Sequence, residues 1–474
     1  MHIRNLRYPG LELDEFITRP REAWCIYGEN RSGIDLFIDL LSGNLHDFSC
    51  DILDIPKQPG MLSFQIQQEI FEEELRRDNT DFIGKIDPGT RVCDFIPNAH
   101  ACLPLLRAFG MDRCLDVGYR QLSSGQCRKL ILLRELSRGT RMLIVQNPYE
   151  GLDQQSCVEL DQALCHLPDQ EIELILTVNS TGDIPAWCTH LAVISKGLLE
   201  HAGPRDHVFS LLLDAQQKTL PTQQTAPDVY QAAGQAPVEE LVFMKDGHAA
   251  YGEKLLFSGL NLTVRTGDHT LITGSNGCGK STLLDIITGD SPKCYTNELR
   301  IFGRKRGSGE SIWDIKRHMG IVSPVLHREH RVPGSALQII LSGLYDTIGL
   351  YRQVHEAEKR TGMHWLAWLG LQDRAGTPFR KLPFAEQRLV LIARALIKRP
   401  RLLIFDEATH GLDDVHRHAL LDLLEKIADQ RLSTILFVSH RKDEQRPFFH
   451  QVIPLEDYAP RGLQCLSSPT AAKN

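Results

Sequence analysis

Residues 269–287 read HTLITGSNGCGKSTLLDII, and this stretch decides the fold of the second half of the chain. Its centre has the spacing G-x-x-x-x-G-K-[ST], preceded by a β-prone run and followed by a helix-forming run. In that context the glycines let backbone N–H groups surround phosphate oxygens. The candidate phosphate-binding residues are Gly274, Ser275, Asn276, Gly277, Cys278, Gly279, Lys280, Ser281 and Thr282. We expect Lys280 to contact the β- and γ-phosphates and Ser281 to ligate Mg²⁺.

Two carboxylates end an apolar run further along the chain. Residues 401–407 read RLLIFDE, so Asp406 and Glu407 follow a strand apolar enough to be buried. Acids at the carboxyl end of such a strand lie beside the phosphate loop of the same sheet. Asp406 suits holding Mg²⁺ through water, and Glu407 suits polarising the attacking water. His440 ends the next apolar run, LFVSH, where a γ-phosphate sensor is expected.

An internal repeat sets the domain organisation. YGENRSGIDLFIDLLSG and QLSSGQCRKLILLRELSRGTRMLIVQNPYEGLD in the first half match ITGSNGCGKSTLLDIITG and KLPFAEQRLVLIARALIKRPRLLIFDEATHGLD in the second. Short apolar runs alternate with helical stretches in both halves, which predicts an α/β fold with a largely parallel sheet. We predict a first domain at 1–213, a linker rich in Gln, Pro, Ala and Thr at 214–237, and a second domain at 238–474.

Composition excludes several classes of protein. The 474 residues are 42% hydrophobic and 24% charged, which is typical of a globular protein of two domains. No run approaches the roughly 18 apolar residues of a membrane span, and the start lacks a secretory signal, so we expect a cytoplasmic protein. The net charge of −7 argues against a nucleic-acid partner. The 12 cysteines form no C-x-x-C pair and are expected to be reduced and mostly buried.

These motifs resemble the Walker A, Walker B and switch-histidine motifs of ABC ATPases. Residues 122–126, LSSGQ, resemble the LSGGQ signature of that family, which makes Ser123, Gly125 and Gln126 candidate nucleotide contacts. The resemblance implies two tandem P-loop nucleotide-binding domains of ABC type, each a core sheet with a helical subdomain, packed head-to-tail. ATP and Mg²⁺ are the implied cofactors. Each ATP would lie between the Walker motifs of one domain and the signature of the other.

The first domain departs from the family pattern at nearly every catalytic position. Its loop at 28–35, GENRSGID, has Ile34 in place of the lysine and Asp35 in place of the Mg²⁺ hydroxyl. Gln146 and Asn147 replace the two carboxylates, and Ser180 replaces the switch histidine. Loss of the lysine and gain of an acid should repel a triphosphate.

The second domain departs in the signature instead. Residues 382–386 read LPFAE, so Pro383 removes a backbone donor, Ala385 adds a methyl group and Glu386 adds a negative charge. In the crossed arrangement of the family, all defects fall in one site and the other keeps every part. The sequence therefore predicts one competent and one degenerate site.

Two further positions match the family pattern less clearly. The glutamine that ABC domains usually carry after the strand beyond Walker A corresponds to Ser323, while Gln65, Gln67 and Gln68 are all candidates in the first domain. This departure puts coupling to a standard transporter partner in doubt. Tyr251 precedes the phosphate loop and is a candidate for stacking on adenine, with an ordinary strand tyrosine as the alternative.

The stretches at 302–327 and 341–351 resemble tandem ABC ATPases associated with molybdenum transport. The resemblance implies an energy-coupling ATPase for molybdate or another oxyanion, which would need separate membrane permease subunits and would sit at the inner face of the membrane. A regulatory or storage-associated ATPase acting on a protein partner stays open. So does a factor acting on ribosomes as ABC-F proteins do, although the short linker, the acidic charge and the degenerate site argue against it.

Overall fold

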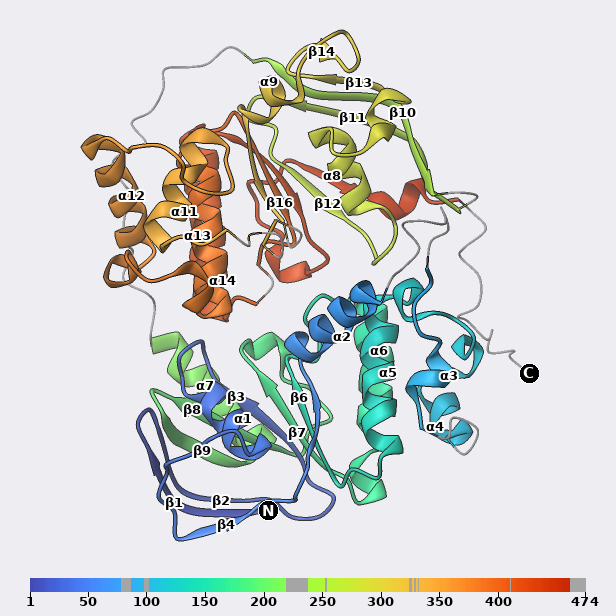
Figure 1. The fold of residues 1–474 in the computed structure, drawn as a ribbon, viewed down its shortest axis with the longest axis vertical. Coiled ribbons are helices and arrows are strands. Elements are labelled where there is room, and N and C mark those ends of the chain that lie inside the picture. Colours follow the sequence, from blue (N-terminus) through green and yellow to red (C-terminus); the bar gives the residue numbers. More distant parts are fainter. Residues whose placement is uncertain are drawn as a thin grey trace. The chain divides into compact units, whose positions relative to one another are not determined.

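The computed structural model describes residues 1–77, 87–97, 102–218, 238–251, 254–323, 326–327, 330, 332–409 and 411–460. The chain divides into two compact units (Figure 1). The first comprises Met1–Thr222 with His410–Arg417, and the second comprises Gln223–Thr409 with His418–Asn474. Helix α7 (Arg205–Lys218) extends into the segment predicted as a linker, and the rest of that linker, 219–237, lies outside the described residues. The exact domain boundaries stay a prediction.

The first unit contains one mixed sheet with a parallel centre. The described strands follow the order β4 (Ile52–Asp54), β1 (His2–Tyr8), β2 (Leu11–Ile17), β9 (Leu198–Pro204), β8 (His190–Ser195), β3 (Ala23–Tyr27), β7 (Glu173–Val178), β6 (Met142–Gln146) and β5 (Gly60–Leu62). Strands β8, β3, β7, β6 and β5 pair in parallel. All five residues of β3 are buried, as expected for a parallel strand covered on both faces.

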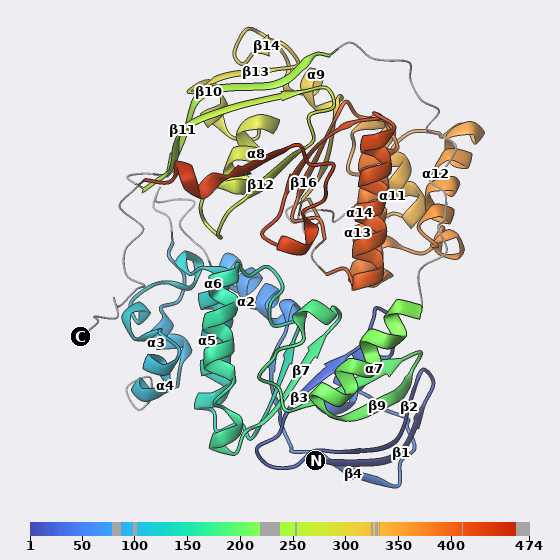
Figure 2. The ribbon, with the colours of Figure 1, turned by 180° about the vertical axis from the view of Figure 1, so that it is seen from behind.

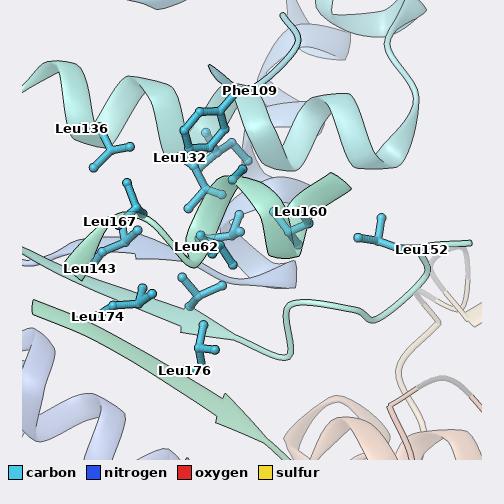
Figure 3. Close-up of a cluster of buried hydrophobic side chains, with 14 of the residues drawn as sticks. Leu62, Phe109, Leu132, Leu136, Leu143, Leu152, Leu160, Leu167, Leu174 and Leu176 are labelled. Atoms are coloured by element: carbon cyan, nitrogen blue, oxygen red, sulfur yellow. The ribbon is translucent and has the colours of Figure 1, made fainter. Parts of the chain in front are cut away.

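Helices cover both faces of this sheet. On one face, Cys25 and Tyr27 of β3 belong to a cluster with residues of α5 (Ser124–Ser137) and α6 (Gln154–Leu164), part of which is drawn in Figure 3. On the other face, Trp24 and Ile26 pack with α1 (Ile34–Ser42). The remaining described α-helices of the unit are α2 (Phe64–Arg76), α3 (Val92–Phe95), α4 (Leu103–Ala108) and α7, which packs against β8 and β9 (Figure 2).

The second unit contains two sheets among its described residues. The parallel sheet has the order β15 (Met319–Val322), β16 (Leu402–Asp406), β17 (Thr434–Val438), β12 (Thr270–Thr273) and β18 (Gln451–Pro454). The antiparallel sheet has the order β11 (Lys254–Arg265), β10 (Glu240–Tyr251), β13 (Glu298–Ile301) and β14 (Arg304–Lys305). Helix α8 (Lys280–Thr288) packs against β10 of the antiparallel sheet and β16 of the parallel sheet. The sequence prediction of a core sheet in each half is confirmed.

A helical subdomain adjoins the parallel sheet of the second unit. Its helices α11 (Ala336–Ser342), α12 (Glu356–Trp368) and α13 (Phe384–Leu396) pack on one another. The short helix α9 (Ile312–Lys316) precedes β15, and α14 (Asp414–Asp429) joins β16 to β17. None of the helices in the described ranges has the length and apolar character that crossing a bilayer requires.

The cysteine prediction is partly wrong. The 11 cysteines in the described part of the chain are free thiols, as expected. Only Cys25, Cys127, Cys188 and Cys294 are buried, and the other seven are partly exposed. Cys465 lies outside the described residues. Six of the partly exposed thiols lie in helices and loops of the first unit, and the seventh, Cys278, lies in the phosphate loop of the second unit.

A buried histidine stands at the start of the strand that leads to the phosphate loop. His269 is 3% exposed, and its Nδ1 accepts the backbone N–H of Ile435 at 3.2 Å. Burial, with a smaller contribution from His450, lowers the pKa of His269 to about 4. The folded unit therefore holds His269 neutral.

This histidine predicts an acid-sensitive second unit. Its contribution to stability is complete above the unfolded pKa of roughly 6.5 and is lost as the pH falls toward 4, a loss of about 3 kcal/mol. His269→Asn keeps an acceptor near the Nδ1 position without a titrating ring. We expect the unfolding midpoint of this variant to fall less between pH 7 and pH 4.5 than that of the parent. His248→Asn, at an exposed site, is the control, and equal acid sensitivity of all three proteins would contradict the assignment.

Candidate active site

The phosphate loop of the second unit joins β12 to α8. Gly274, Gly277 and Gly279 have φ angles of 151°, 80° and 105°, which a side chain would disfavour. A Cβ on Gly274 would also lie 2.7 Å from the Cys278 Sγ. Burial raises the pKa of the Cys278 thiol, so that side chain is neutral and the loop offers its backbone to a ligand. The backbone N–H of Ser275 donates to the Glu456 carboxylate.

Lys280 is buried and folded back over this loop. Its Nζ donates to the carbonyl oxygens of Gly274 at 2.8 Å and Ser275 at 2.9 Å. These two bonds hold a cation beside the loop backbone. A phosphate bound in the loop would therefore meet a positive charge that is already positioned.

The predicted acids lie where the sequence placed them. Asp406 is the last residue of β16, and its Oδ2 accepts the Ser281 hydroxyl at 2.9 Å. Its Oδ1 is buried and has no hydrogen-bond partner within the described part of the chain. Burial, and next the neighbouring Glu407, raises the pKa of Asp406 to about 6. A divalent cation here would have Ser281 and the orphan oxygen as ligands and would lower that pKa.

Glu407 occupies a strained backbone position. Its φ is 47°, in the left-handed region that costs a non-glycine residue about 1–2 kcal/mol. Its N–H donates to the Val438 carbonyl at 3.1 Å. The His440 Nδ1 lies 3.6 Å from a Glu407 carboxylate oxygen, and both side chains are partly exposed. Strain at such a position is typical of a functional site.

The structure says less about the predicted adenine contact and about the residue that replaces the usual glutamine. Tyr251 is the last residue of β10, and its side chain lies outside the described part of the structure. Ser323 follows β15, and its Oγ accepts the Leu326 N–H at 3.1 Å. In the first unit, the three glutamines that are candidates for the corresponding position all fall in α2.

The segment 122–126 of the first unit forms the start of α5. Ser123 is the N-cap, and it and Gln126 bond each other's backbone N–H groups in a capping box. A Cβ on Gly125 would approach the Ser156 Oγ to 3.1 Å, so this glycine is closely packed. In the second unit, Pro383 caps α13 without a side-chain hydrogen bond, and Glu386 lies in the first turn.

The corresponding loop of the first unit, residues 28–35, also joins a strand to a helix but lacks the lysine and the hydroxyl of the second unit's loop. Gly33 has φ 99° and precedes α1, but Ile34, in the lysine position, is 8% exposed and packs into the apolar core. Burial raises the pKa of Glu29 in the loop, and also that of Asp35. Asn147 repeats the strained φ of Glu407, at 44°.

Comparison with known proteins identifies the family. A family model described as "ABC transporter" matches residues 257–410. The "ABC transporter ATP-binding protein ModF" of Escherichia coli K12 is 34% identical over 446 residues, covering 92% of this chain and 91% of ModF. The chain belongs to the ABC ATP-binding proteins. It is thus an ATP-binding ATPase made of two tandem ABC cassettes.

Two further ABC proteins are similar over different extents. The "Molybdate import ATP-binding protein MolC" of Haemophilus influenzae is 29% identical over 192 residues, 40% of this chain and 69% of MolC. A crystal structure of the archaeal ribosome recycling factor aABCE1, in complex with ribosomal stalk protein aP1, matches with a TM-score of 0.55 and 16% identity. It covers 93% of this chain and 84% of that one. The structural match supports the tandem ABC fold alone.

Sequence inspection missed two arginines of these cassettes. Arg388 in α13 and Arg128 in α5 are 1% and 2% exposed, and both donate to backbone carbonyls beyond the end of the Walker B strand. Alignment of the internal repeat could have found them, because both are arginines at the same position of the two repeats.

The position of Lys280 predicts the effect of its removal. Lys280→Ala should weaken ATP binding by about 1.5–3 kcal/mol, the size of a hydrogen bond to a charged group, which raises Kd roughly 10- to 100-fold. Equilibrium binding of a fluorescent ATP analogue to the full chain measures this change. Lys293→Ala, outside the loop, is the control. An unaltered dissociation constant for Lys280→Ala would rule out the phosphate contact.

Proposed function

We propose that this ATPase hydrolyses ATP at one competent composite site, carries one degenerate site, and serves the transport or handling of molybdate or a related oxyanion. The observation that carries the catalytic part is the gathering of Lys280, Ser281, Asp406, Glu407 and His440 at one sheet edge of the second unit. The first unit has an unsuitable residue at each of these positions.

Each residue of the competent site has a chemical role. The loop backbone and Lys280 bind the β- and γ-phosphates, with Thr282 following Ser281 in the first turn of α8. Ser281 and Asp406 would hold Mg²⁺, which supplies charge neutralisation on the phosphates. Glu407 accepts the proton of the attacking water, and His440, 3.6 Å from Glu407, contacts the γ-phosphate. Tyr251 is proposed to stack on adenine.

The signature of the first cassette completes this site in our proposal. Ser123, Gly125 and Gln126 would face the γ-phosphate bound by the second cassette in a head-to-tail arrangement. The support comes from the distribution of defects, since a crossed arrangement leaves one site with the Walker motifs, the switch histidine and the signature all intact. The capped start of α5 offers backbone N–H groups and a positive helix end to an anion.

The oxyanion part of the proposal rests on the similarity to ModF over most of both chains and on the import of molybdate by MolC, as its name states. Such a role requires separate membrane permease subunits and a location in the cytoplasm, at the inner face of the membrane. Affinity purification from the native host, with Glu407→Gln used to trap ATP, tests it. Recovery of integral-membrane subunits supports transport. Recovery of ribosomes, or of a soluble regulatory or storage protein instead, would overturn it.

Glu407 provides the sharpest test of the catalytic assignment. We expect Glu407→Gln to bind ATP with unchanged affinity and to hydrolyse it about 10²- to 10⁴-fold more slowly, the usual size of a general-base contribution. Phosphate release from the purified chain measures the rate. Glu425→Gln, on α14, is the control for loss of a carboxylate elsewhere in the cassette. Turnover at the parental rate in Glu407→Gln would eliminate the assignment.

A pair of substitutions tests the crossed site. Gly125→Asp places a negative charge beside the γ-phosphate of the competent site and should reduce hydrolysis severely. Ala385→Asp, in the cassette with the intact Walker motifs, would face the degenerate site in the crossed arrangement and should leave turnover within a few-fold. Phosphate release from the two variants is compared side by side.

Folding must be controlled in this pair, because a Cβ on Gly125 already approaches Ser156. Gly125→Ala adds the same contact without the charge and should retain more activity than Gly125→Asp, with a similar unfolding midpoint. A greater loss from Ala385→Asp than from Gly125→Asp would refute the head-to-tail arrangement.

A further inference from the structure

Arg388 holds the backbone that carries the proposed catalytic glutamate. Its guanidinium is buried, with 1% of the residue exposed, and it donates from three nitrogens to three main-chain carbonyls. Nη2 bonds the Glu407 carbonyl at 2.7 Å, Nε bonds the Ala408 carbonyl at 3.0 Å, and Nη1 bonds the Ser323 carbonyl at 3.3 Å. The planar guanidinium group of Arg388 thus links the turn after β16 to the segment after β15.

Both backbone polar groups of Glu407 are hydrogen-bonded. Its N–H donates to the Val438 carbonyl at 3.1 Å, and its own carbonyl accepts Arg388. Since its φ of 47° is disfavoured for a residue with a side chain, the surrounding contacts must hold it there. This backbone conformation sets the direction of the Cα–Cβ bond, from which the side chain starts toward its carboxylate position.

The first unit has a related arrangement in which all three acceptor carbonyls lie in the single turn after β6. Arg128 donates to the carbonyls of Asn147 at 2.9 Å, Pro148 at 2.7 Å and Glu150 at 2.6 Å. The Asn147 N–H donates to the Thr177 carbonyl at 2.8 Å, and its φ is 44°. Asn147 has no carboxylate to direct. The chain therefore provides a comparison in which a buried arginine supports a turn that carries no catalytic carboxylate.

We infer that Arg388 is a positioning residue for ATP hydrolysis, which sets the direction of the Glu407 carboxylate toward the attacking water without touching ATP. This inference rests on the proposed role of Glu407. Lysine cannot replace it, because a single ammonium group cannot span three carbonyls in one plane. Loss of the guanidinium group should then slow ATP hydrolysis and leave nucleotide binding intact.

The experiment compares Arg388→Lys with Arg128→Lys in the full chain. Arg388→Lys should lower kcat about 10- to 100-fold, as expected for a misplaced catalytic group, with KM for ATP changed by less than about threefold. Arg128→Lys should lower the unfolding midpoint by a similar amount and keep kcat within about threefold of the parent. Arg388→Ala should regain part of its kcat when millimolar guanidinium is added, and equal concentrations of sodium chloride should have no effect.

The outcomes separate this inference from the proposed function. Parental kcat in Arg388→Lys, with Glu407→Gln inactive, would overturn the positioning role and leave the catalytic site standing. Equal losses of kcat in the two lysine variants, or no rescue of a folded Arg388→Ala, would also overturn it and make the arginine purely structural. Parental turnover in Glu407→Gln would overturn both.

Discussion

The register of three parallel strands is the constraint on which the second unit depends. Val438 of β17 pairs with Asp406 of β16 on one side and with Ile272 of β12 on the other. The phosphate loop begins two residues after Ile272, and His440 follows two residues after Val438. Parallel pairing brings these three strand ends to one edge. A slip of one residue in β16 would turn the Asp406 side chain to the opposite face and break its bond with Ser281.

The sequence predicts the parts of this site that depend on local pattern. The phosphate loop and the apolar run before Asp406 each combine a contiguous motif with the strand or helix that it needs, so their place in the fold could be predicted. The backbone strain at Glu407 could not be predicted, because the bonds that hold it come from Val438 and Arg388. Val438 is distant from Glu407 in the sequence, and no motif marks Arg388. The exposed fraction of each cysteine could not be predicted for a related reason, since it depends on packing between segments that are distant in the sequence.

The two units separate the requirements of folding from those of catalysis. Both keep a buried arginine, a residue with positive φ and a carbonyl from the neighbouring strand at the end of the Walker B strand. Only the second keeps the carboxylates. Burial disfavours the charged form of Asp406, so replacing its carboxylate with a neutral amide costs little stability. Removing the arginine would instead leave several carbonyls without a partner, each costing about 1–3 kcal/mol. Replacement of the two carboxylates by Gln146 and Asn147 in the first cassette has therefore left this backbone arrangement in place.

The same separation explains the two unequal signature segments. A helix start is stabilised by acidic side chains in its first turn, because they interact favourably with the positive end of the helix dipole. Glu386 has this position in α13, where Pro383 provides no side-chain cap, so the acid supports a helix that lacks one. The same negative charge makes that helix end unsuitable for a phosphate. Helix α5 has the uncharged capping box of Ser123 and Gln126, so its first turn carries no acidic side chain that would repel an anion.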